Sequence, residues 1–596
     1  MSNPLLRTCT CLAIVVLGAA AVPLRAQGSA NFGFEERSLV DPARPARWST
    51  GGGAGFAFAL DSAAAHGGRF SLRISRDPTG SGFAVANQTI PIALARGKRV
   101  RLRGWIRTAD VTTGQAAFWM RVDGPANRPL AFDNMMGRGA KGTTPWTRYE
   151  IELPVDSAAT GVMFGALYAG DGSVWYDDVE IALDGVPFDP ASIRAWEPAP
   201  AQAAWVRRHA ISLATDDPTA GDADLRALHP LVEGARIVAL GEATHGTREF
   251  FRAKHRLVRW MVEREGVTVF AIEANMPEAR RVNEYVLTGR GDPRAALAGL
   301  YFWTWNTEEV LALIEWMRAY NASGRGRVEF WGFDMQYASV AADSVRAFVA
   351  RADPAFLPTV DSAYALADSA TAGMRRGRPA VAAMAPAWRD AAARVVAHLA
   401  ANRASYLTRF DSMQVAWAEQ NARIVEQAAS MDLPNGASRD SSMAVNVAWI
   451  VAHQPPGTRI ALWAHNGHVA RDGAWMGGYL DRRFGSAYRV FGFAFGEGDY
   501  TAVGSRGLRA YPAAAPAPGS VESVLRRVGM PRLVLDLRGA ARERDGAWLA
   551  EPHLFREIGA GAMDVQFIER RVAGRFDALI YFDHTTPSRL LPRPGR

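Results

Sequence analysis

The segment ARIVALGEATHGTREFF, residues 235–251, decides the fold class of this chain. It opens with the short apolar run ARIVAL, which is what a fully buried parallel strand requires. Residues 250–262 then place apolar side chains at helical spacing, and a second apolar run covers residues 267–272. The order strand, turn, helix, strand predicts an α/β domain with a mostly parallel sheet. Glu242 and His245 lie on the turn, where enzymes of this architecture carry catalytic groups.

Three apolar runs further along the chain also end in polar or ionisable side chains. Residues 267–272 precede Glu273, residues 328–333 precede Asp334 and Gln336, and residues 460–464 precede His465 and His468. Because the carboxyl ends of parallel strands share one edge of an open sheet, we expect these side chains to converge with Glu242 and His245. Taken singly, Asp334 could cap a helix and His468 could bond to a carbonyl group, but the repeated arrangement favours one shared site.

Six short blocks stand in a fixed order along the chain. Two of them are the turn GEATHG at residues 241–246 and the motif HNGH at residues 465–468. The other four are FAIEA at 270–274, WGFDMQ at 331–336, RDSSMAVN at 439–446 and FDALIY at 576–581. Together they resemble the erythromycin esterase-like hydrolases over roughly residues 200–590, a family whose hallmark is Gly-Glu-x-x-His-Gly followed by His-Asn-x-His. A single Glu-x-x-His is a weak signal, whereas six ordered blocks indicate membership.

The resemblance implies hydrolysis of an ester, such as the lactone of a macrolide antibiotic, by water activated on His245. A neutral imidazole is well matched to taking a proton from water at neutral pH. Glu242 or Glu273 could accept from the ring and fix its tautomer, and His465 or His468 could polarise the carbonyl group or protonate the leaving alcohol. An acylated sugar or another lactone remains an alternative substrate.

Lys254 stands where the antibiotic-inactivating members of the resembled family carry an arginine. A lysine keeps a positive charge for a developing oxyanion but loses the two-pronged hydrogen bonding of a guanidinium group. We therefore place Lys254 among the catalytic candidates. The residues that we expect to contact the substrate are Asp334, Gln336, Arg439, Asn446 and Trp303.

Other chemistries are weighed on the same residues. The sequence has no Gly-x-Ser-x-Gly motif, which disfavours the serine triad of α/β-hydrolases. Its only cysteines, Cys9 and Cys11, fall in a segment that we expect to be removed. No cofactor is required by this reading, but a divalent metal stays open, because the histidines and glutamates of the expected site are ligand types for zinc or manganese. A non-catalytic protein that binds a metal or a ligand on the same fold is the alternative function.

The composition and the N-terminus indicate where the protein works. Residues 1–26 combine an arginine, a short apolar run and a small-residue cleavage site, which predicts a signal peptide and a secreted or periplasmic protein. The run is too short for a spanning helix, so we expect no membrane span. The net charge of +8 comes from scattered arginines, with only three lysines, and does not predict nucleic-acid binding.

Residues 30–185 change to an alternating pattern with frequent turn residues, which predicts an all-β sandwich. This module resembles carbohydrate-binding or galactose-binding-like jelly rolls, in which Glu35 and Asp178 could hold a structural calcium. Trp105 or Trp119 could stack on sugar rings or could simply belong to the core. A proline-containing linker, residues 186–204, is expected before the catalytic domain at 205–592, where residues 342–430 should form a helical cap over the strand ends.

Overall fold

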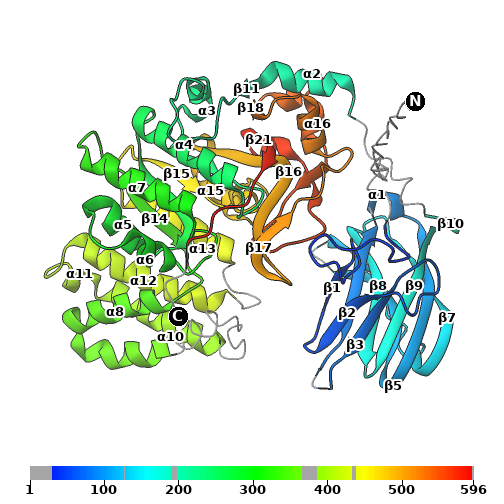
Figure 1. Cartoon of the computed structure of the whole chain (residues 1–596). Helices are drawn as coiled ribbons and strands as arrows, with labels where there is room; N and C mark the ends of the chain where they lie inside the picture. Colours follow the sequence, from blue (N-terminus) through cyan, green and yellow to red (C-terminus); the bar gives the residue numbers. More distant parts are fainter. Residues whose placement is uncertain are drawn as a thin grey trace, which may run out of the picture.

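The computed structural model describes residues 30–78, 80–90, 92–125, 128–188, 198–365, 385–431 and 438–592. The predicted signal peptide, residues 1–26, lies outside these ranges. A search of these ranges finds no helix with the length and apolar character needed to cross a membrane. Figure 1 shows a β-rich N-terminal module, coloured blue to cyan, beside a larger domain of helices and strands coloured green to red.

The N-terminal module is a ten-stranded antiparallel sheet with the strand order β1-β4-β8-β5-β9-β3-β2. β6 and β7 pair with β5, and β10 pairs with β9. The strands are β1 (Ser49–Gly52), β2 (Phe56–Asp61), β3 (Ser71–Arg76), β4 (Ala84–Ile90), β5 (Arg99–Asp123), β6 (Pro129–Asp133), β7 (Ala140–Pro154), β8 (Gly161–Gly170), β9 (Ser173–Leu183) and β10 (Val186–Pro187). One short helix, α1 (Ile92–Ala95), leads into β5.

The 25-residue strand β5 folds this sheet back on itself. Its first part pairs with β7 and β9, whereas residues 114–123 pair with β8 and, near the end, with β6. The two halves share one core, in which the rings of Phe118 and Tyr176 lie 5.6 Å apart. The module is therefore built almost wholly of antiparallel β-strands, as predicted, and β5 takes part in both halves of the folded sheet.

Of the side chains that we considered for sugar or calcium binding in this module, Trp105, Asp178 and Glu35 contact other residues of the protein. The ring of His66 stacks on Trp105 with a centroid separation of 4.0 Å, and Trp119 is half-buried. Asp178 lies 2.6 Å from Nδ1 of His66, and Glu35 accepts the backbone N–H groups of residues 69 and 70. Among the residues in the described ranges, no group of three or more His, Cys, Asp or Glu side chains is arranged to hold a metal ion.

The second domain is built on a nine-stranded sheet with the order β11-β18-β21-β16-β12-β15-β13-β14, with β17 paired to β16. Its strands are β11 (Ala210–Ser212), β12 (Ile237–Leu240), β13 (Val267–Asn275), β14 (Glu329–Asp334), β15 (Arg459–Trp463), β16 (Tyr488–Gly504), β17 (Gly507–Pro512), β18 (Arg532–Asp536) and β21 (Ala578–Thr585). The five neighbouring pairs from β21 to β14 are parallel, while β11, β17 and β18 pair antiparallel. A separate hairpin joins β19 (His553–Arg556) to β20 (Phe567–Arg570).

Helices cover both faces of this sheet (Figure 1). Alternate residues of β12 enter two different cores: Ile237 and Ala239 enter one, Val238 and Leu240 the other. The first core includes residues of α2 (Pro200–His209), α8 (Ser339–Ala352), α10 (Ala385–Ala401), α12 (Ser412–Ser430), α13 (Arg439–Ala452), α14 (Asn466–Val469), α15 (Met476–Phe484), α16 (Val521–Arg527) and α17 (Val572–Arg575). The second includes residues of α3 (His229–Val232), α4 (Arg248–Arg264), α5 (Ala279–Thr288), α6 (Pro293–Ala298) and α7 (Glu308–Ala322). Together with the short α11 (Arg403–Tyr406), α8, α10 and α12 make the described part of residues 342–430 largely helical.

A loop of the N-terminal module contacts the α/β domain. The backbone N–H of Leu39 donates to Asp564 at 2.9 Å, and Val40 packs against the second core of the α/β domain. Within the predicted linker, α2 already begins at Pro200, because proline is well suited to the first turn of a helix. Trp205 of this helix is buried in the first core.

Candidate active site

The turn after β12 is fixed by close backbone and side-chain contacts on both flanks. A Cβ atom on Gly241 would lie 2.2 Å from the side-chain oxygen of Asn466, and one on Gly246 would lie 1.8 Å from the carbonyl oxygen of Thr501. Only glycine fits such approaches. The turn therefore holds Glu242 and His245 in one position against the ends of β15 and β16.

Glu242 is fully buried and accepts three hydrogen bonds. Its Oε1 lies 2.5 Å from Nδ1 of His245, while its Oε2 accepts from Nζ of Lys254 at 2.5 Å and from the indole N–H of Trp463 at 2.8 Å. Burial alone would raise the pKa of Glu242, but Lys254 and His245 lower it below its ordinary value. A carboxylate only accepts hydrogen bonds, so Nδ1 of His245 carries the proton and Nε2 carries the lone pair.

His245 reaches solvent with about a tenth of its side chain. Its Nε2 makes no hydrogen bond to any residue that the structure describes. Trp305 packs edge-on against the ring with a centroid separation of 5.8 Å, and the Trp305 indole donates to the backbone oxygen of Glu273 at 2.7 Å. Glu242 and Trp305 thus hold the imidazole in place and leave Nε2 available as a base.

Lys254 does not occupy the place that we expected for it. It is fully buried beneath Glu242, with its Nζ 4.3 Å from the centre of the Trp463 ring. Burial lowers the pKa of Lys254 to about 8, although Glu242 acts in the opposite direction. Direct contact with a substrate oxyanion is excluded in this arrangement, and the lysine instead neutralises and positions Glu242.

A second cluster surrounds Arg439, at the start of α13. Its guanidinium group forms a two-pronged pair with Asp334, at 2.7 and 3.2 Å, and donates to Glu273 at 2.7 Å. Its Nη1 lies 3.0 Å from Nε2 of His468. Burial would raise the pKa of Glu273, but His468 and Arg439 hold it well below its ordinary value. The guanidinium group of Arg439 therefore connects Asp334, Glu273 and His468, which come from three other elements.

His465 has no ring nitrogen free for a substrate. Its Nε2 lies 3.0 Å from the backbone oxygen of Ile558, and its Nδ1 accepts from the N–H of Gly467 at 3.1 Å. Burial lowers its pKa to about 4, with the neighbouring His245 and His468 acting in the same direction. Because both ring nitrogens of His465 are engaged, His468 is the better placed of the two histidines that we predicted to act on the carbonyl group or the leaving alcohol. The ring of His465 instead caps α14 and lies 5.2 Å from the ring of His245.

The residues predicted for substrate contact separate into two groups. Asp334 and Arg439 lie in the cluster, and Gln336 donates to Asp334 at 2.8 Å. Asn446 is fully buried and its amide bonds to Gln420, Gln427 and the backbone of Phe333, so it supports the interior and does not meet a substrate. Trp303 is half-buried and lies two residues before Trp305.

Sequence reasoning missed three contributors to the site. Trp463 is the last residue of β15, so its apolar strand context gave no sign of the bond to Glu242. Asp440 stood in a quoted block without an assigned role, yet it lies 2.7 Å from Nδ1 of His468. The Ile558 carbonyl that engages His465 comes from a segment 93 residues away, and no local pattern indicates it.

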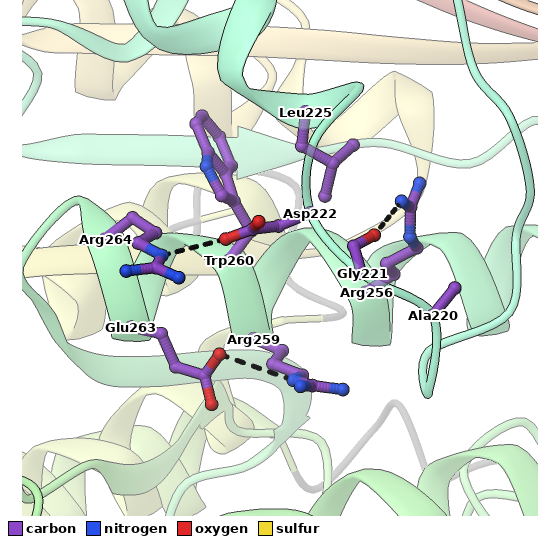
Figure 2. Close-up of a pocket in the computed structure, with 9 residues that line it drawn as sticks. All are labelled: Ala220, Gly221, Asp222, Leu225, Arg256, Arg259, Trp260, Glu263 and Arg264. Carbon is purple, nitrogen blue, oxygen red and sulfur yellow. Dashed lines mark hydrogen bonds and ion pairs between the residues drawn. The ribbon is translucent and has the colours of Figure 1, made fainter.

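A hollow on α4 lies away from these groups (Figure 2). It is lined by Ala220, Gly221, Asp222, Leu225, Arg256, Arg259, Trp260, Glu263 and Arg264. The charged side chains pair with the protein itself: Arg256 binds Asp224, Arg264 binds Asp222 at 2.8 Å, and Arg259 lies 3.4 Å from Glu263. The pairs with Asp224 and Asp222 fasten the preceding loop to α4, whereas the pair of Arg259 with Glu263 lies within the helix. None of the predicted site residues lines the hollow.

Comparison with known proteins finds relatives that cover most of the α/β domain. The family model described as erythromycin esterase matches residues 262–585. The Bacillus subtilis protein YbfO is 24% identical over 420 residues, covering 64% of this chain and 91% of its own length. Erythromycin esterase type II of Escherichia coli is 28% identical over 167 residues, or 27% of this chain and 39% of its own. A crystal structure of a mutant of the erythromycin esterase EreC in its open conformation covers 65% of this chain and 99% of its own, with 19% identity and a TM-score of 0.53, and shares the fold. This chain belongs to the erythromycin esterase family.

Proposed function

We propose that the protein hydrolyses a carboxylic ester or lactone with water activated by His245. One observation carries the proposal: Glu242, itself fixed by Lys254 and Trp463, holds the proton on Nδ1 of His245 and leaves Nε2 as a base. An imidazole whose tautomer is set by a buried carboxylate is the arrangement that general-base catalysis requires.

The proton balance of this reaction needs only one histidine. As the water oxygen bonds to the carbonyl carbon, one water proton passes to Nε2 of His245. The tetrahedral intermediate then collapses, the bond between the carbonyl carbon and the alcohol oxygen breaks, and the departing alkoxide takes the proton back from the imidazolium. A carboxylic acid and an alcohol leave, and His245 returns to its starting state.

In this proposal, the positive charge that stabilises the developing oxyanion comes from the cluster around Arg439. Lys254 is sealed beneath Glu242, whereas about a quarter of the Arg439 side chain is exposed. A cation at the rim of a largely buried site stabilises negative charge more strongly than one in water. We assign this role to Arg439, supported by His468.

The substrate class follows from the family and not from the geometry. Macrolide-like lactones are one candidate, because named relatives are erythromycin esterases. Acylated sugars are the other, with the N-terminal module as a sugar-binding partner and residues 1–26 directing the chain to a secreted or periplasmic location. The alternative is a metal-dependent hydrolase, or a metal- or ligand-binding protein, on the same fold.

Hydrolysis of an ester panel by the full mature chain tests the proposal. The panel holds a macrolactone, acetylated sugars and a simple aryl ester, and each assay is run with and without a chelator. His245→Gln should abolish turnover, while the control His229→Gln, on the exposed ring that pairs with Glu265, should keep it. Turnover that survives in His245→Gln contradicts the assignment of the base. Loss of wild-type turnover on chelation would instead support the metal-dependent alternative.

A further inference from the structure

The carboxylate of Asp440 forms a second histidine–carboxylate pair in the site. Asp440 lies in the first turn of α13 and is 8% exposed. Its Oδ1 lies 2.7 Å from Nδ1 of His468 and accepts the backbone N–H of Met476 at 2.9 Å. Because the backbone N–H of Met476 has a fixed position, it holds Oδ1 of Asp440 next to the imidazole of His468.

The two neighbours of His468 leave the neutral ring one tautomer. Asp440 only accepts, so Nδ1 must carry the proton. Arg439 only donates, and its Nη1 lies 3.0 Å from Nε2, so that nitrogen must carry the lone pair. The opposite tautomer would turn the N–H of Nε2 toward the guanidinium group and leave Asp440 without a hydrogen bond from His468.

The tautomer of His468 also decides how many hydrogen-bond acceptors surround the Arg439 guanidinium group. Nε2 of His468 lies 3.4 Å from Oε1 of Glu273, the oxygen that accepts from Arg439. In the neutral ring, Nε2 is a third acceptor for the guanidinium group, beside Glu273 and Asp334. With an N–H at that position, the ring would instead compete with Arg439 for Glu273.

We propose that Asp440 is a positioning residue, which acts through the tautomer of His468 to keep the Arg439 guanidinium fixed in the site. Its effect on turnover rests on the proposed function, whereas its effect on the tautomer does not. A guanidinium group that loses one of its three acceptors is free to shift, and displacements of about 1 Å at a catalytic group can cost about 100-fold in rate.

The test compares Asp440→Asn with Asp440→Glu and with a matched control. Asn can turn its amide N–H₂ toward Nδ1, which favours the wrong tautomer, whereas Glu keeps a carboxylate. Asp411→Asn is the control, because Asp411 caps the exposed start of α12, where asparagine caps equally well. The tautomer is read by ¹⁵N NMR of histidine-labelled full chain, with the His468 signals assigned by their loss in His468→Gln.

Burial lowers the pKa of His468, but Glu273 and Asp440 together raise it above its ordinary value, so the spectra are compared at a higher pH, where the ring is neutral. There we expect wild type, Asp411→Asn and Asp440→Glu to show a protonated Nδ1 and an unprotonated Nε2 at His468, and Asp440→Asn to lose this pattern. On an ester that the wild type cleaves, kcat of Asp440→Asn should fall about 100-fold with KM changed less than about threefold, and Asp440→Glu should recover part of the loss. An unchanged tautomer in Asp440→Asn overturns the proposal, and so does an altered tautomer with wild-type kcat. Should the wild type cleave no ester, the proposed hydrolase function fails, and the NMR comparison alone decides the role of Asp440.

Discussion

Replacing Lys254 by methionine removes the cation that neutralises Glu242 while keeping an unbranched side chain over the rings of Trp463 and Phe493. The two charges lie 2.5 Å apart and neither side chain is exposed. Removing one partner of such a buried pair leaves an uncompensated charge and costs about 3–5 kcal/mol. We expect the free energy of unfolding of the α/β domain to fall by that amount.

The double variant Lys254→Met/Glu242→Gln separates the charge effect from packing. It removes both charges, so most of the lost stability should return, although activity should not, because His245 loses the carboxylate that fixes its tautomer. Scanning calorimetry of the full chain measures the stability of both variants, with Lys98→Met in the N-terminal module as the control. A single variant within about 1 kcal/mol of wild type, or a double variant no more stable than the single one, would refute the reasoning.

The same pair also sets a pH dependence. Lys254 helps to lower the pKa of Glu242, so in Lys254→Met the carboxylate should take up a proton at a higher pH than in wild type. Because protonated Glu242 has lost the negative charge that holds the proton on Nδ1 of His245 and can itself donate a hydrogen bond, the acidic limb of the kcat/KM profile should move to higher pH. An acidic limb at the same pH in both proteins would contradict this coupling.

Three further outcomes are expected. Burial raises the pKa of Glu522 to about 7 from an ordinary value near 4.5. The wild type should therefore lose about 3 kcal/mol of stability as the pH rises between these two values. Glu522→Gln should be more stable than wild type at pH 8 and equally stable at pH 4, and equal Tm values of the two proteins at both pH values would contradict the shift. Gly246→Ala brings a Cβ atom to 1.8 Å from the Thr501 carbonyl and should lower both Tm and turnover, whereas unchanged values would show that the turn can relax. Trp463→Phe removes the indole N–H from Glu242 and should cost about 1–3 kcal/mol in unfolding free energy, measured by calorimetry, with no loss if water replaces the donor.

The expected meeting of Glu242, His465, Glu273 and Asp334 follows from strand patterning. Each apolar run is short and bounded, and β12, β15, β13 and β14 turn out to be neighbours, so the four residues stand at or just beyond the same edge. Strand identity could be predicted because period and length are local properties. The order of the strands could only be assumed.

The individual tasks of these side chains could not be predicted, because they depend on contacts from distant segments. The motif made His465 a catalytic candidate, but its Nε2 bonds to the carbonyl group of Ile558, which the motif does not indicate. The burial of Lys254 depends on which face of α4 meets Trp463 and Phe493, and the sequence pattern of α4 alone did not settle this. In the N-terminal module, the alternating pattern indicates strands, but it does not show that β5 pairs with β7 and β9 in its first part and with β8 from Gly114 onward.

The hairpin of β19 and β20 touches the catalytic turn and the N-terminal module with the same loop. Ile558 bonds to the backbone of Ala243 and to His465, and six residues later Asp564 receives the N–H of Leu39. One short loop therefore supports the turn after β12 on one side and contacts the N-terminal module on the other. Removing the module would take the N–H of Leu39 away from Asp564 in this loop, so the full chain is the unit in which the turn after β12 should be studied.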